Sequence, residues 1–64
     1  MGTEEGKFIP YEVTVIDKDT LRKGYFIIQA TSQEEADENA KVSAAKYSEY
    51  YKGNFTIISI LQLA

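Results

Sequence analysis

The 64-residue sequence contains no cysteine, no histidine and no tryptophan, and it has a single proline. Without cysteine, the chain can form neither disulfides nor thiolate metal sites, and without histidine it lacks the side chain that most often titrates near neutral pH. A core of this size rarely supplies more than about 3–5 kcal/mol of stability. Disulfides and thiolate or histidine metal sites are excluded, so if the fold needs additional stabilisation, another protein chain is the expected source.

The sequence also lacks a strong excess of charge and any long apolar run. Seven basic residues lie among ten acidic ones, which gives a formal net charge of −3. This balance argues against direct nucleic-acid binding and against attachment to an anionic membrane surface. No stretch reaches the length of a membrane span, and residues 1–7 have no apolar run of the kind found in a signal peptide. We therefore expect a soluble, cytoplasmic protein.

Residues 32–51 are the one long periodic stretch, and they predict a helix. Ser32 is the expected N-cap, and Glu35 three residues later completes a capping box. Thr31 and Glu34 offer the same pairing one residue earlier, so two starting points remain open.

The predicted helix ends at Lys52 and Gly53, with Gly53 able to adopt a positive φ. At helical spacing, one face collects small residues first and aromatic residues at its end. We expect this face to pack against a sheet. Its residues are Ala36, Ala40, Ala44, Tyr47, Tyr50 and Tyr51.

Three further stretches predict β-strands, at residues 8–16, 25–31 and 54–63. The first alternates apolar and polar positions, which is the period of a strand with one buried face. Residues 17–20 are short and polar, so they predict the turn of a hairpin between the first two strands.

The order of these elements predicts a small two-layer β-β-α-β unit of the α+β class. A right-handed crossover through the helix brings the third strand beside the first. We expect a three-stranded antiparallel sheet in the order 2-1-3 with one helix packed on one face. Residues 8–64 would form this single domain after a flexible lead-in at residues 1–7. In the alternative topology, the third strand pairs in parallel with the second.

One helix cannot cover both faces of the predicted sheet, and the third strand is apolar on both sides. Strict alternation would turn Leu61 and Leu63 toward the helix. Isoleucine suits even an exposed strand, so the uncovered apolar side chains have a simple explanation in β-propensity. A contiguous patch on so small a domain is, however, more typical of an interface. The predicted interface residues are Ile16, Tyr25, Ile27, Ile58 and Ile60.

The sequence offers little for catalysis or ligand binding. No serine has an evident general base, and no glycine-rich loop opens the helix to hold a phosphate. Asp17 and Asp19 resemble the start of a calcium loop, but Leu21 occupies the third ligand position. We therefore predict no enzyme activity, no catalytic, metal or cofactor-binding residue and no cofactor.

Acidic side chains crowd the outer surface of the predicted helix. Lys41 and Lys46 interrupt them, which favours an ordinary solvated surface. Spaced carboxylates can also imitate phosphates and occupy the nucleic-acid site of another protein. The residues that would do so are Glu34, Glu35, Glu38 and Glu49.

These patterns lead to two functional hypotheses. The first is a non-catalytic protein-interaction module that forms a homodimer through the open sheet face, of phage or mobile-element origin. The alternative is an acidic inhibitor that blocks a nucleic-acid-binding partner protein through its helix surface. A small-ligand binder or enzyme has the least support.

Overall fold

The computed structural model describes residues 7–63, which form four elements in the order β-β-α-β. These are β1 (Ile9–Asp17), β2 (Lys23–Ala30), α1 (Gln33–Tyr51) and β3 (Phe55–Gln62). The strands form one sheet in the order β2-β1-β3, and β1 is antiparallel to both neighbours.

The predicted fold class and sheet order are therefore confirmed, and the alternative with the third strand beside the second is wrong. Each element begins and ends within two residues of its predicted bounds. The predicted lead-in at residues 1–7 lies, except for Lys7, outside the described residues.

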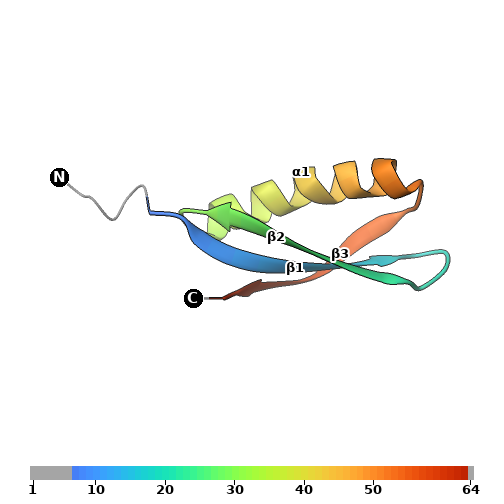
Figure 1. The fold of residues 1–64 in the computed structure, drawn as a ribbon, viewed down its shortest axis with the longest axis horizontal. Coiled ribbons are helices and arrows are strands. Elements are labelled where there is room, and N and C mark those ends of the chain that lie inside the picture. The colour runs from blue at the N-terminus through green and yellow to red at the C-terminus, as the bar shows by residue number, and fades with distance from the viewer. Residues whose placement is uncertain (1–6, 64) are drawn as a thin grey trace.

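The core lies between the sheet and α1, which runs along one face of the sheet (Figure 1). Alternate residues of a strand point to opposite faces, so every second residue of β1 and β2 contributes to this layer. The three helix alanines allow the helix to approach the strands closely. The buried core residues are Tyr11, Val13, Val15, Ile28, Ala30, Ala36, Ala40 and Ala44.

The helix starts at the predicted cap. Ser32 has an extended backbone, and its Oγ accepts a hydrogen bond of 3.2 Å from the Glu35 N–H. The Glu35 carboxylate reaches back one residue further than a capping box requires and accepts 2.6 Å bonds from both the hydroxyl and the N–H of Thr31. These bonds, the hydroxyl first, lower the pKa of Glu35 because they stabilise its charged form.

The helix ends differently from the expectation. Lys52, not Gly53, adopts the left-handed conformation, with φ of 54°. Gly53 is needed for space instead: a Cβ there would lie 2.7 Å from both Asp17 Oδ2 and Phe55 Cε2. The chain therefore places a costly backbone conformation on a lysine and keeps the glycine for a close approach.

An irregularity in the register of β3 alters the alternation of its side chains. Thr14 pairs with Ser59, but the next residue of β1, Val15, pairs with Ile57. Ile58 is therefore an extra residue, a β-bulge on this edge strand.

The bulge corrects two expectations about β3. Ile60 pairs with the fully buried Val13 and packs against the core, so its predicted place on the open face is wrong. Leu61, expected to face the helix, pairs instead with Glu12 on the opposite side of the sheet. Strict alternation fails here because it makes no allowance for an inserted residue.

Candidate interaction surface

The side of the sheet opposite α1, here called the open face, carries a group of exposed apolar side chains. Ile16 is partly buried there, and it pairs with Lys23 of β2. The others are 50–60% exposed, which leaves about half of each side chain available for contact. We call this group, together with the exposed Ile58 at the β3 bulge, the apolar patch: Ile16, Tyr25, Ile27, Leu61 and Ile58.

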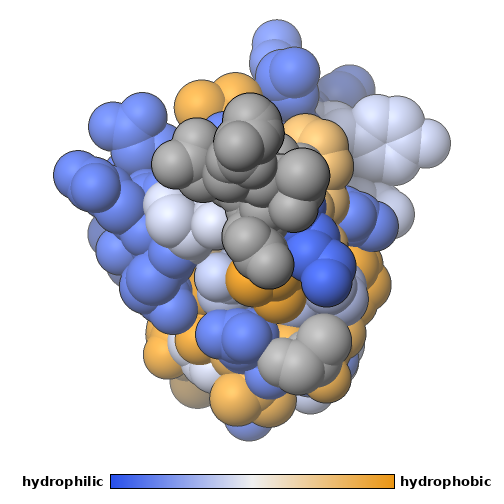
Figure 2. Space-filling model, turned by 90° about the vertical axis from the view of Figure 1, so that its left-hand side faces the viewer, coloured by the Kyte–Doolittle hydropathy of each residue, from blue (hydrophilic) through white to orange (hydrophobic). Residues whose placement is uncertain are grey.

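Figure 2 views the molecule from the end at which α1 begins. Hydrophobic residues gather in its lower part, away from the helix, whereas hydrophilic residues dominate the upper left. Four predicted interface residues belong to the apolar patch, and Leu61 takes the place expected for Ile60. No local signal identifies Leu61, because strict alternation along β3 turns it toward the helix and only the pairing with β1 reveals the bulge. That the patch binds another protein stays a prediction.

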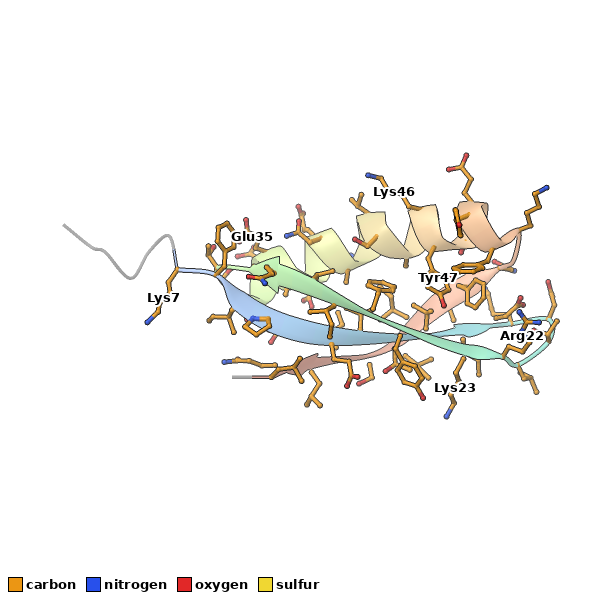
Figure 3. All side chains as sticks on the ribbon, in the orientation of Figure 1. Lys7, Arg22, Lys23, Glu35, Lys46 and Tyr47 are labelled. Atoms are coloured by element: carbon orange, nitrogen blue, oxygen red, sulfur yellow. The ribbon has the colours of Figure 1, made fainter. Side chains whose placement is uncertain are left out.

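Two charged residues interrupt or border the patch. Glu12 lies in its middle, because it pairs with Ile27 on one side and with Leu61 on the other. Lys23 lies at the hairpin end of the patch, and its side chain extends from the sheet away from α1 (Figure 3). The open face therefore combines apolar side chains and neutral polar ones, such as Thr14 and Ser59, with a central carboxylate and a peripheral ammonium group.

A second feature is an aromatic cluster under the C-terminal half of α1. Tyr47 points from the helix toward the sheet (Figure 3), with its ring centroid 5.6 Å from that of Phe26 and 4.8 Å from that of Phe55. The predicted core position is confirmed for Tyr47. It is wrong for Tyr50 and Tyr51, which are 78% and 55% exposed.

The exposed tyrosines border a shallow groove between β2 and α1. Tyr25 of the strand and Tyr50 of the helix lie on its two sides, together with Lys46. β2 is an edge strand of the sheet, so the groove runs beside backbone groups that β1 does not use.

The acidic residues on α1 do not form one surface. Glu34, Glu35 and Glu38 line a shallow hollow at the start of the helix with Ser32. Glu49 lies eleven residues after Glu38, a rise of about 16 Å along the helix axis. The structure brings three of the four predicted acidic residues together and separates the fourth.

Asp17 is the buried carboxylate of the described chain, and its contacts are structural. It accepts hydrogen bonds from the N–H groups of Asp19 at 2.8 Å and Thr20 at 3.3 Å. The bond from Asp19 is the main cause of a lowered pKa, which outweighs the opposing effect of desolvation. Within residues 7–63, no group of three or more potential metal-binding side chains comes together. Asp17 thus holds the hairpin turn in place.

Together, the fold and this surface define a small two-layer β-β-α-β domain with one uncovered sheet face that carries several exposed apolar side chains. The chain matches no protein-family model, no curated protein and no solved structure. Between residues 7 and 63, no helix combines the length and the apolar character needed to cross a membrane.

Proposed function

We propose that this protein is a non-catalytic, cytoplasmic protein-interaction module that self-associates through its open face. The observation that carries the proposal is the apolar patch, which α1 leaves uncovered. Exposed apolar side chains that gather on one face of so small a domain are more typical of a contact surface than of a surface in water. The small size and acidic composition are the basis for proposing a phage or mobile-element origin.

The area of the patch is consistent with a reversible dimer. Four of its side chains are about half exposed, so covering each would contribute roughly 1 kcal/mol. A two-fold axis uses the same patch on both copies, which doubles the contribution to roughly 8 kcal/mol. Association costs about 4–15 kcal/mol in lost translational and rotational freedom. We therefore expect a weak dimer that dissociates on dilution.

Sedimentation equilibrium from low micromolar to millimolar concentration tests the proposal. Ile58→Glu and Leu61→Glu should abolish the dimer and leave the circular dichroism spectrum of the folded monomer unchanged, because both side chains are exposed. Val42→Glu adds the same charge on the outer surface of α1, where Val42 is exposed, and should leave the dimer intact. A wild-type protein that remains monomeric throughout this range would overturn self-association.

Ile60→Glu tests whether Ile60 belongs to the core and not to the apolar patch. Because Ile60 packs against the buried residues, a charge there should lower the stability of the monomer itself. If Ile60→Glu were tolerated and Ile58→Glu unfolded the chain, the assignment of the open face would be reversed.

A second candidate function, an acidic inhibitor of a nucleic-acid-binding protein, rests on the hollow lined by Glu34, Glu35 and Glu38. Its test is co-purification from the native host. The co-purified partner should be a nucleic-acid-binding protein, and added DNA duplex should compete for its binding site and release it from this protein. Glu34→Lys with Glu38→Lys should prevent capture, whereas Glu49→Lys, at the distant end of the helix, should have little effect. If the double variant Glu34→Lys with Glu38→Lys still captured the partner, this function would be excluded.

A further inference from the structure

Glu12 sets a condition on any molecule that covers the open face. Its carboxylate lies between Ile27 and Leu61, so a covering surface would remove it from water. An isolated buried charge is strongly unfavourable unless it is paired. The covering surface must therefore place a cation near Glu12.

The open face itself carries a suitable cation. Among its described strand residues, Lys23 is the one with a positive charge. We propose that a second copy of this chain covers the open face with its strands antiparallel to those of the first, so that Glu12 of each copy pairs with Lys23 of the other. This inference rests on the self-association proposed above and specifies its geometry.

The register of the sheet supports this arrangement. Glu12 lies two residues before Thr14 on β1, and Ile16, which pairs with Lys23, lies two residues after it. A two-fold axis that crosses the strands at the level of Thr14 therefore exchanges the level of Glu12 with that of Lys23.

The distance is within the reach of the two side chains. Packed sheets lie about 10 Å apart and neighbouring strands about 4.8 Å, so the Cα atoms of Glu12 and of Lys23 in the second copy would be about 11 Å apart. Extended glutamate and lysine side chains together span that separation. Each dimer would contain this pair twice.

The competing two-fold arrangement is electrostatically unfavourable. An axis parallel to the strands leaves every residue at its own level, and it maps the central strand β1 onto itself. Glu12 would then face Glu12 of the second copy in a region that excludes water. Like charges in contact suppress such an arrangement, so the charges select the antiparallel orientation.

A charge exchange tests the pairing by sedimentation equilibrium. Glu12→Lys and Lys23→Glu should each weaken the wild-type dimer by about tenfold or more. The double variant restores opposite charges across the interface and should return the dissociation constant to within about threefold of wild type. Glu38→Lys and Lys41→Glu make the same changes in net charge at exposed positions of α1, which packs on the other face of the sheet, and should have little effect. Circular dichroism of each variant checks that the monomer is folded.

The outcomes separate this inference from the proposed function. If the double variant dimerises no more tightly than the single variants, the antiparallel pairing is wrong. The proposal of self-association would still hold if Ile58→Glu disrupts the wild-type dimer. If neither Glu12→Lys nor Lys23→Glu changes the dissociation constant, the pairing is also wrong. A monomeric wild-type protein would overturn both proposals.

Discussion

The contact between Gly24 and Tyr47 gives the sharpest stability prediction. Gly24 is buried on the helix side of β2, opposite Val15, and its φ is not positive. A Cβ at this position would lie less than 3 Å from the hydroxyl oxygen and two ring carbons of Tyr47. Gly24→Ala must therefore displace a ring at the centre of the aromatic cluster.

The magnitude follows from two opposing effects. Overpacking a core position costs about 1–3 kcal/mol, whereas alanine in place of glycine within a strand gains about 0.5–1 kcal/mol. Because three atoms of one ring would lie within 3 Å, the overpacking cost should fall in the upper part of its range, and we expect Gly24→Ala to lower the free energy of unfolding by about 1–2.5 kcal/mol. In a domain of this size, each kcal/mol corresponds to a fall of roughly 4–8 °C in Tm.

Urea denaturation followed by circular dichroism can isolate the contact through a double-mutant cycle. Tyr47→Leu keeps an apolar side chain that ends well short of Gly24, so Gly24→Ala in that background should be neutral or stabilising. Tyr50→Ala is the matched control, because Tyr50 is mostly exposed and the three atoms nearest to a Cβ at position 24 all belong to Tyr47. In the Tyr50→Ala background, the loss should equal that in the wild type.

Two results would refute this reasoning. An unchanged free energy of unfolding for Gly24→Ala would mean that the ring moves aside without cost. An equal loss in the Tyr47→Leu background would mean that another group, not Tyr47, excludes a side chain at this position.

Three further changes test the ends of the helix and the hairpin. Ser32→Ala should cost about 1 kcal/mol in urea denaturation, since it removes the acceptor for the Glu35 N–H, and a negligible loss would rule out this cap. Lys52→Gly should raise Tm because glycine adopts the left-handed conformation without the roughly 1 kcal/mol penalty of a side chain, whereas Lys46→Gly inside the helix should lower it. The lowered pKa values of Asp17 and Glu35 stabilise the fold above their ordinary values, and this contribution is lost as pH falls through the lowered ones. Acid titration should therefore show the stability of the wild type falling below about pH 4, and the fall should be shallower for Asp17→Asn. Equal falls in the wild type and in Asp17→Asn would show that Asp17 does not contribute.

The amino-acid sequence by itself determined the elements and their arrangement. The alternation in β1 and the spacing of Ala36, Ala40 and Ala44 identify the buried faces, because burial requires one side of each element to be apolar. Ser32 marks the helix start because a side-chain oxygen there satisfies a free N–H. With only four elements, the short connections and the crossover rule then left two sheet orders, of which the structure adopts the preferred one.

Only the tertiary structure decided how the special positions are used. The bulge at Ile58 depends on how β3 pairs with β1, and a strand that is apolar at consecutive positions contains no period that would reveal it. The pairing turns Ile60 inward and Leu61 outward, and so it decides which side chains form the apolar patch.

The two glycines in the described chain illustrate the same limit. Gly24 makes room for Tyr47, and Gly53 makes room for Asp17 and Phe55, but neither has a positive φ. A sequence shows that a glycine is able to turn the backbone or to admit a neighbour. Which of these it does depends on residues that are distant in the chain and meet only when the helix packs on the sheet.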